Sequence, residues 1–482
     1  MILFSAIIIL ACFIGVIILI ITERLNRAIA TLSGAIITYL TLVFLEGLDF
    51  SVIVNLLFGS QEDGYVNLHS IILIFSMMIV VIIAHEAGLF QFLALKLILL
   101  SKGKPIPLLI INCIITVIVS AVLNNILTVI ILVPLTITIS RIINVDPTPF
   151  ILTQAVLVNI GGTLFAFSSI PNILIVSYAK ITFSEFFLNV GLISIVVFIF
   201  TIPFFVFLYK DEIKISEGSS KVLMEFNAWN LVQNKTLLYE SVISFFILIT
   251  LFMIIPPSII SPDIIALTIS VILVIVSRLN PKDIIDKIDY ELIIYLLGIF
   301  VIAGGLEIVG ITNLLGNYIS ILSGDDLFTH TIIILWFSAF LSSSIDNIPI
   351  TKVLIPVIGG AYKDTPSQNS KLIFYSLAIG ANWGDNLTPL GDNILVMNIA
   401  EQNKRPISFK KFFKLGFITT IYQLSIVTII FTLLFHWYFG LMVILIISFL
   451  LLITGLISKS GPRILKIKIK NSIRTIREII IR

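Results

Sequence analysis

The stretch SSSIDNIPITKVLIPVIGG, residues 342–360, places Asp346 and Lys352 inside an otherwise apolar segment, 331–358. At membrane depth each such charge costs roughly 2.5 to 3.5 kcal/mol, so it needs a specific reason to be there. The polar residues Ser342 to Thr351 interrupt the segment midway, and a membrane helix that stops halfway can turn back if its tip is buried in protein or faces water. A second apolar segment, 107–141, is interrupted in the same way by SAVLNNILT, residues 120–128. Both segments are therefore predicted to be re-entrant hairpins.

The composition places these hairpins in an integral membrane protein. The chain has 482 residues, of which 58% are hydrophobic and 12% charged, with a mean hydropathy of +1.15; soluble domains carry about 25% charged residues. Apolar stretches of near-spanning length recur along the whole chain. They predict an all-α polytopic protein with about 11 crossings, at residues 2–22, 28–45, 68–92, 150–180, 185–208, 238–255, 264–277, 290–315, 372–400, 412–435 and 440–456.

The distribution of basic residues predicts the orientation of the chain. With the N-terminus outside and neither hairpin crossing, most Lys and Arg residues near span ends fall on the cytoplasmic side, with Lys180, Lys363 and Lys371 as exceptions. The acidic loop that contains Glu62 and Asp63 then lies outside. The basic tail, 459–482, lies inside, as an orientation signal or as a site for lipid or a partner. We therefore expect a multi-pass protein of the cell membrane with a cytoplasmic C-terminus.

The chain contains an internal duplication. Three pairs of matched landmarks, Gly88 with Gly310, Asn125 with Asn347, and Asn172 with Asn393, share nearly one offset in numbering. Each half holds an odd number of crossings, so the two halves must be inverted relative to each other, an arrangement typical of secondary transporters. The predicted divisions are a first repeat at 1–209, a cytoplasmic linker at 210–237, a second repeat at 238–435, an extra span at 436–458 and the basic tail.

Each repeat also holds a second interruption. In the first it is NIGGTLFAFSSIPN, residues 159–172, and in the second GANWGDNLTPLGDN, residues 380–393. Gly and Pro at this density stop a membrane helix, which predicts broken helices at 150–180 and 372–400. Half-helix starts attract anions and half-helix ends attract cations, so helix dipoles alone leave the sign of the substrate open.

Three carboxylates in these interruptions, Asp346, Asp385 and Asp392, are candidates for coupling a cation or protons. Lys352, the one basic residue near them, is a further candidate for proton coupling. Capping of a half-helix is the alternative role for Asp346 and Asp392, and a snorkelling side chain is the alternative for Lys352. His85-Glu86 is a weaker candidate for a proton relay. No metal site or cofactor is expected beyond a bound sodium ion or exchanged protons. The predicted substrate and ion site comprises Asn124, Asn125, Thr128, Asn159, Ser169, Asn172, Asp346, Asn347, Thr351, Asn382, Asp385, Asn386, Thr388, Asp392 and Asn393.

These motifs resemble, in order, those of the ion transporter superfamily, which includes arsenite permeases, NhaD-type sodium/proton antiporters, the melanosomal P protein and citrate or dicarboxylate transporters. The resemblance covers residues 68–191 and 289–417, including both hairpins and the closing segment IAEQNKRPISFKKFFKLGF, residues 399–417. It implies inverted repeats that form scaffold and transport regions, a homodimer, and elevator-like alternating access. Asp385 and Asp392 depart from the arsenite-permease pattern, in which Gly and a small residue would be expected, and Ser169 replaces an acid.

The predicted function is secondary active transport of a small inorganic ion or metalloid oxyanion, by arsenite-type efflux or by sodium/proton antiport. A sodium- or proton-coupled citrate or dicarboxylate transporter is the alternative, and a passive channel subunit is a weaker one. No enzyme is expected, because NWGD, residues 382–385, lacks the first Gly of a presenilin-like motif and no hydrolase or phosphate-loop motif occurs. The expected partners are the lipid bilayer and the small ion, with a soluble ATPase left open and no nucleic acid.

Overall fold

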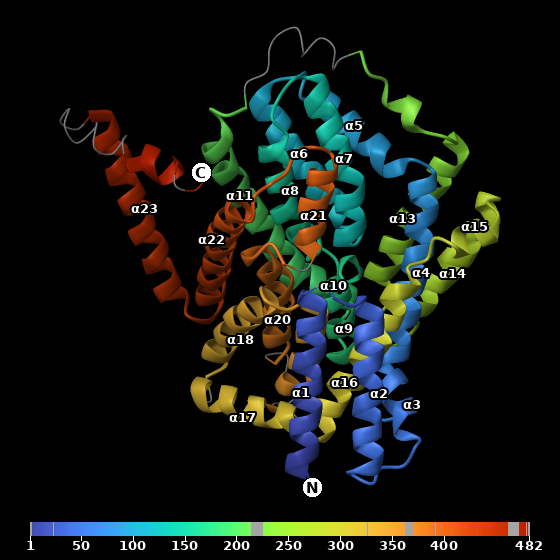
Figure 1. Cartoon of the computed structure of the whole chain (residues 1–482). Coiled ribbons are helices and arrows are strands. Elements are labelled where there is room, and N and C mark those ends of the chain that lie inside the picture. Colours follow the sequence, from blue (N-terminus) through green and yellow to red (C-terminus); the bar gives the residue numbers. More distant parts are fainter. Residues whose placement is uncertain are drawn as a thin grey trace.

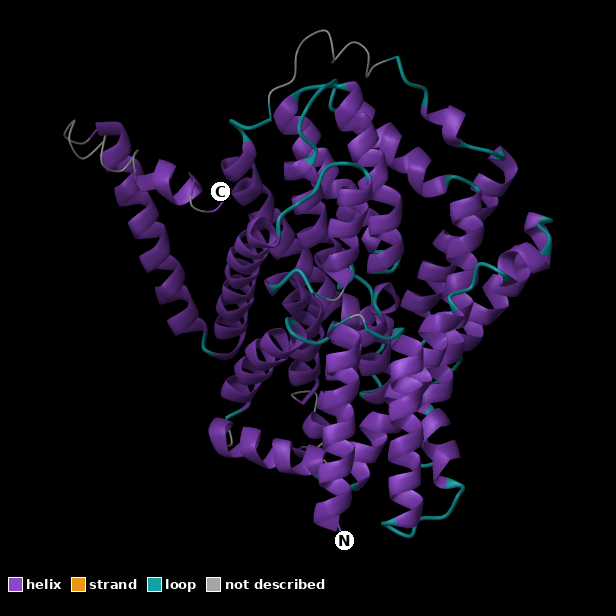
Figure 2. Cartoon of the chain, viewed as in Figure 1, coloured by secondary structure: helices purple, strands orange, loops and turns teal. Residues whose placement is uncertain are grey.

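In the computed structural model, the described residues form helices joined by loops and turns, with no strand among them (Figure 2). The structure describes residues 2–22, 24–213, 225–324, 326–361, 370–390, 392–460, 472–478 and 480; Lys363, part of the predicted linker and most of the basic tail lie outside them. The first repeat contains α1 (Ile2–Ile21), α2 (Arg27–Phe44), α3 (Val52–Phe58), α4 (Val66–Glu86), α5 (Leu89–Leu99), α6 (Pro105–Ser120), α7 (Asn125–Ile142), α8 (Thr148–Gly161), η1 (Ala166–Ser168), α9 (Ile170–Tyr178), α10 (Phe183–Phe186), η2 (Phe187–Gly191) and α11 (Leu192–Tyr209).

The second repeat follows the same order of elements. After η3 (Ala228–Leu231) in the linker, it contains α13 (Lys235–Ile254), α14 (Pro262–Ser277), α15 (Pro281–Ile285), α16 (Tyr290–Ile308), α17 (Ile311–Ser323), α18 (Leu327–Ser342), α19 (Asn347–Ala361), α20 (Ser370–Gly384), η4 (Asp385–Leu387), α21 (Asp392–Gln402) and α22 (Phe409–Phe435). The additional α23 (Trp437–Ser460) follows it. Figure 1 shows the first hairpin, α6 and α7, toward one end of the molecule and α17 and α18 toward the other.

Eight of the described helices are long and apolar enough to cross a membrane, and several shorter apolar helices accompany them. Large apolar side chains such as Leu3, Phe246 and Ile275 are more than two-thirds exposed, as expected where a helix faces lipid. The predicted all-α polytopic membrane fold is therefore confirmed. One of the eight long helices, α7, is an arm of the first hairpin, so apolar length by itself does not identify a crossing.

Two helix pairs, which we call the scaffold, are equivalent under the repeat: α2 packs along α16, and α14 packs along α4. Small residues allow α2 and α16 to approach closely. A Cβ atom at Gly298 would lie 2.6 Å from the Thr31 side chain, and Gly305 sits against Thr38 in the same way. The inverted halves thus hold each other through matching contacts.

Two predicted crossings, 68–92 and 290–315, are each divided by a glycine. Gly88 (φ 75°) follows the end of α4, and Gly310 (φ 82°) follows the end of α16. Positive φ values of this kind favour glycine, because a Cβ atom clashes in the left-handed region. The chain turns at both positions, so α5 and α17 are separate helices rather than continuations of the spans. The hydrophobic runs are continuous in sequence, and only the glycines mark where each span stops.

The hairpins and the broken helices pack together through small residues. α6 lies against α8, and α18 lies against α20. A Cβ atom at Gly161 would meet Ser120, and Gly384 lies against the Ala339 backbone in the equivalent place. This close packing brings each hairpin tip to the interruption of the broken helix in its own repeat.

Candidate functional site

The tip of the first hairpin is held by amide and hydroxyl side chains. Asn124 caps α7, since its Oδ1 accepts from the Leu127 amide over 2.8 Å, and Thr128 donates to the Asn124 carbonyl. Asn125 Nδ2 donates to Asn159 Oδ1 over 2.5 Å, and Ser120 Oγ donates to the Val158 carbonyl. The tip is therefore fixed to the end of α8.

The tip of the second hairpin has the same plan but uses a carboxylate. Ser342 Oγ donates to the Ala381 carbonyl over 2.6 Å and to Asp385 Oδ1 over 2.5 Å. Asn347 Nδ2 donates to Asp385 Oδ2 over 2.8 Å. Asp385 is 3% exposed, so both of its oxygens are engaged within the protein and anchor the hairpin to α20.

The hydrogen bonds show that Asp385 occupies the position in the second repeat that Gly162 occupies in the first. Asn172 donates to the Gly162 carbonyl over 2.7 Å, as Asn393 donates to the Asp385 carbonyl over 2.8 Å. A Cβ atom at Gly162 would lie 2.9 Å from Asn125 Oδ1, so the first tip has no room there for an acidic side chain. In the first repeat Asn125 therefore pairs with an amide, whereas in the second repeat Asn347 pairs with a carboxylate.

Amide side chains also join the two repeats to each other. Asn159 Nδ2 donates to Asn386 Oδ1 over 2.8 Å, and Asn382 Nδ2 donates to Asn172 Oδ1 over 2.8 Å. Ser169 Oγ donates to Asn382 Oδ1 over 2.6 Å. We call this group of Asn159, Ser169, Asn172, Asn382 and Asn386 the amide cluster. All five residues are buried, so the main role of the cluster is to hold the two broken helices together by hydrogen bonds. The five side chains also lie next to the hairpin tips.

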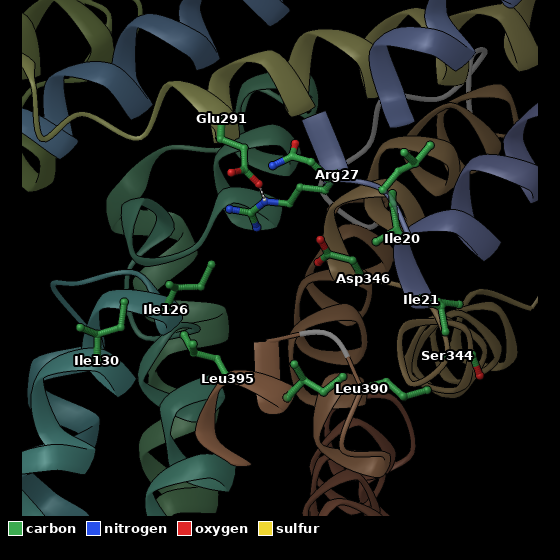
Figure 3. Close-up of a pocket in the computed structure, with 13 residues that line it drawn as sticks. Ile20, Ile21, Arg27, Ile126, Ile130, Glu291, Ser344, Asp346, Leu390 and Leu395 are labelled. Carbon is green, nitrogen blue, oxygen red and sulfur yellow. Dashed lines mark hydrogen bonds and ion pairs between the residues drawn. The ribbon is translucent and has the colours of Figure 1, made fainter. Parts of the chain in front are cut away.

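Asp346, unlike Asp385, faces a cavity. It lines a space of about 500 Å³ with Arg27, Glu291, Ser344 and apolar residues of α7 and α21 (Figure 3). Tyr295 of α16 donates its hydroxyl to Asp346 Oδ2 over 2.9 Å, whereas the Ile348 amide lies 3.5 Å from Oδ1. Asp346 thus caps α19 only weakly and is held mainly by the scaffold.

Arg27, the first residue of α2, lies on the wall of the same cavity. Its Nε donates to Glu291 over 3.1 Å, its Nη2 lies 3.6 Å from Asp289, and its guanidinium lies 5.7 Å from the centre of the Tyr295 ring. The sequence suggested only an orientation role for Arg27. The sequence did not indicate Tyr295 as a site residue, because its partner Asp346 lies in a different element, far along the chain.

A smaller adjoining cavity, about 30 Å³, lies where both hairpin tips meet. Asn124 and Asn125 of the first tip and Asp346 and Asn347 of the second line it, together with Ser169 and Arg27. The first residues of α7, α19 and α9 therefore converge on one space, and a helix start carries a partial positive charge. Among the described residues, no group of three or more His, Cys, Asp or Glu side chains is arranged to hold a metal ion.

Lys352 lies away from this cavity. Its Nζ donates to Asn67 Oδ1 of α4 over 2.7 Å and lies 4.8 Å from the centre of the Phe300 ring of α16. These contacts join the second hairpin to the scaffold. Lys352 therefore contacts side chains of α4 and α16 and lines neither of the two cavities that contain Asp346.

The remaining candidates are placed as follows. Thr388 donates to the Ser343 carbonyl, which ties the second interruption to the hairpin tip. Thr351 is buried, and its hydroxyl has no hydrogen-bond partner among the described residues. α21 begins at Asp392, whose side chain lies outside the described residues. Glu86 pairs with Lys287 over 2.7 Å at the end of α4, so His85-Glu86 sits at a helix end rather than at the hairpin tips.

Comparison with known proteins agrees with this architecture. The model of the citrate transporter family CitMHS matches residues 17–380. The chain belongs to the citrate transporter family. Among its relatives, the 46 kDa membrane protein of Mycobacterium leprae is 26% identical over 85% of this chain and 94% of that protein. The P protein of Sus scrofa is 25% identical over 84% of this chain and 56% of its own length.

A solved structure supports the fold of this citrate transporter family member. The YdaH transporter of Alcanivorax borkumensis, described as having an unusual topology, superimposes with a TM-score of 0.59. The match covers 86% of this chain and all of that one, at 11% sequence identity. The predicted membership of the ion transporter superfamily is confirmed, and relatives named as transporters favour a transport role over an enzymatic one.

Proposed function

We propose that this chain is a secondary active transporter whose substrate is a small anion, such as a carboxylate or an oxyanion, bound where the hairpin tips meet. The observation that carries the proposal is the convergence of three helix starts and Arg27 on one cavity. Backbone amides at helix starts and a guanidinium are groups that recognise carboxylate and oxyanion oxygens. Arg27 is held in place by Glu291, which a bound anion would have to displace or share.

Asp346 is the group we assign to proton coupling. It lines both cavities, whereas Asp385 has both oxygens engaged by Ser342 and Asn347. An anion and an ionised carboxylate in one small space repel each other, so protonation of Asp346 favours anion binding. Movement of the anion together with a proton, in the same direction, follows from this repulsion.

Sodium/proton antiport is the second candidate. The half-buried carboxylate of Asp346 supports it, as do the amide oxygens of Asn124 and Asn347 beside it, since oxygen ligands suit hard cations. In that case Arg27 would only fix the scaffold. We also propose, from the charge pattern, the cell membrane as the location, with the N-terminus outside and the C-terminus in the cytoplasm.

The test is reconstitution into liposomes that contain a pH-sensitive dye, challenged in turn with citrate, arsenite, sodium and lithium. We expect Arg27→Gln to raise the KM for an anion at least about tenfold, the loss of roughly one charge-assisted hydrogen bond. Arg24→Gln is the matched control, because Arg24 is exposed and lies outside the cavity. Proton-linked movement of sodium alone, with equal KM values in both variants, would favour the second candidate. If none of the four moved, transport of these ions would be rejected.

A further inference from the structure

A second cavity, of about 440 Å³, is lined by residues of α4, α9, α10 and α14 and of the loops beside them. His69, Ser177, Lys180, Thr182 and Asp263 are among its polar lining residues. His69 Nδ1 lies 2.8 Å from Asp263 Oδ2. The Asp263 side chain is 4% exposed and the His69 side chain 43%, so a buried carboxylate is paired with an imidazole that water can reach.

This pair is the repeat equivalent of the Arg27–Glu291 pair. His69 and Glu291 are related by the same offset in numbering that relates Gly88 to Gly310 and Asn125 to Asn347. Each pair joins the first turns of two packed scaffold helices: α2 and α16 in one case, α14 and α4 in the other. The acid and the base have exchanged places, because Glu291 belongs to α16 whereas His69 belongs to its counterpart α4.

The two pairs lie at different depths of the scaffold. Asn67 of α4 donates to the Leu56 carbonyl over 2.9 Å, and the Leu56 side chain fills the space beside Gly304. The start of α4 therefore lies beside the C-terminal half of α16, whereas Glu291 belongs to its first turn. The two pairs consequently lie beside opposite halves of α16.

The chemistry of the two pairs differs in one respect. Arginine stays charged at every accessible pH, whereas histidine is the side chain whose charge changes between about pH 5 and pH 8. Asp263 from α14 and Lys180 after α9 are the other charged groups among the described residues that line the second cavity, and the loop after α13 contributes Pro256, Pro257 and Ser258. The net charge of this lining is zero (+1 for Lys180 and −1 for Asp263) when His69 is neutral, and +1 when it is protonated.

We propose that the second cavity is an entry site for small anions whose affinity is set by the protonation of His69, with His69–Asp263 acting as the titratable counterpart of Arg27–Glu291. The sign of the effect is fixed by the charge count: anions are attracted more strongly as the pH falls. The role of this cavity as an entry route for substrate rests on the proposed function. The pH dependence of its electrostatic potential can be measured without any substrate.

The experiment places a single thiol in the cavity. In full-length protein with Cys12 and Cys113 replaced by alanine, Ser177→Cys is labelled with methanethiosulfonate reagents carrying either a sulfonate or a quaternary ammonium group. The ratio of the two rates reports the local potential, and the ionisation of the thiol itself cancels. From pH 7.5 to pH 5.5 we expect the sulfonate-to-ammonium ratio to rise at least about fivefold, the effect of one added charge nearby.

Variants make the test specific. In His69→Gln the ratio should stay low at every pH, and in His69→Arg it should stay high. His436→Gln is the matched control, since His436 is exposed on the loop between α22 and α23, and it should keep the wild-type profile. A pH-dependent ratio that survives in His69→Gln would overturn the proposal, as would a flat ratio in wild type. Since no transported ion enters this measurement, the result stands apart from the liposome test of the proposed function.

Discussion

The replacement of Asp385 distinguishes an anchoring carboxylate from a coupling carboxylate. Asp385 accepts from Ser342 and from Asn347, and it is almost fully buried. Asp385→Leu would leave Asn347 Nδ2 without this acceptor and would remove the bond from Ser342, whose hydroxyl keeps the Ala381 carbonyl. An unpaired buried group costs about 1 to 3 kcal/mol and a lost hydrogen bond to a charged group about 1.5 to 3 kcal/mol, so the expected loss of stability is about 2.5 to 6 kcal/mol.

Asp385→Asn should cost less, because its amide can keep both contacts. Its oxygen can accept from Asn347 Nδ2, and its NH₂ can donate to Ser342 Oγ, while the Ser342 hydroxyl continues to donate to the Ala381 carbonyl. Charge-assisted hydrogen bonds exceed neutral ones by about 1 kcal/mol each, so the expected loss is about 2 kcal/mol, with the hairpin still docked.

Two measurements check this reasoning. Thermal unfolding in detergent should rank wild type, Asp385→Asn and Asp385→Leu in order of falling midpoint. In liposomes, Asp385→Asn should keep proton-linked transport, whereas Asp346→Asn should abolish the linkage. An Asp385→Asn protein with wild-type stability and uncoupled transport would refute the anchoring role and return the coupling role to Asp385.

Three further outcomes follow from the geometry. Tyr295→Phe removes the 2.9 Å hydrogen bond that stabilises the charged form of the Asp346 carboxylate. Because that charge repels the anion, the substrate KM should fall about fivefold to tenfold, whereas Tyr290→Phe at the exposed start of α16 should leave it unchanged; equal KM values in the two variants would contradict the contact. Alanine at Gly310, where no atom lies within 4 Å of the added Cβ, should cost about 1 to 2 kcal/mol from positive φ alone, and alanine at Gly88 should cost more because it also meets the Leu231 carbonyl. Equal shifts in the thermal midpoint would exclude that difference. Ile130 and Asp289 are the repeat equivalents of Lys352 and Asn67. If each repeat can adopt the conformation that the other has here, Ile130 and Asp289 should come into contact in the state that opens to the other side of the membrane. Cysteines at these two positions should then be joined by a short bifunctional thiol reagent. Cysteines at Lys352 and Asn67, which are in contact here, should be joined in the present state. If cysteines at Ile130 and Asp289 were never joined during turnover, the exchange of conformations would be contradicted.

Much of the fold could be predicted from sequence because its signals are local. Apolar length, the polar interruptions and the matched landmarks indicated the hairpins and the inverted repeat. The equivalence of Asn124 with Asp346 could also be seen, since one offset in numbering holds through the hairpins.

The parts that escaped prediction depend on contacts between distant segments. The alignment of Asp385 with Gly162 was hidden because the stretch from Gly162 to Asn172 is longer than the equivalent stretch from Asp385 to Asn393. Arg27 and Tyr295 join the site only when α2 and α16 pack beside the second hairpin. The sequence around Arg27 and Tyr295 does not indicate that either residue lies beside the tip of the second hairpin.

The amide cluster has a consequence for the range of conditions in which the protein keeps its shape. Asparagine and serine side chains neither gain nor lose a proton at physiological pH, so the joint between the two broken helices is insensitive to acid and to salt. Asp346 lines a small cavity together with Ser169 of this cluster, whereas His69 lines a separate cavity that none of the five cluster residues lines. Acidification can therefore change the charge that an ion meets along its path, while the hydrogen bonds of the amide cluster between the two broken helices stay chemically the same.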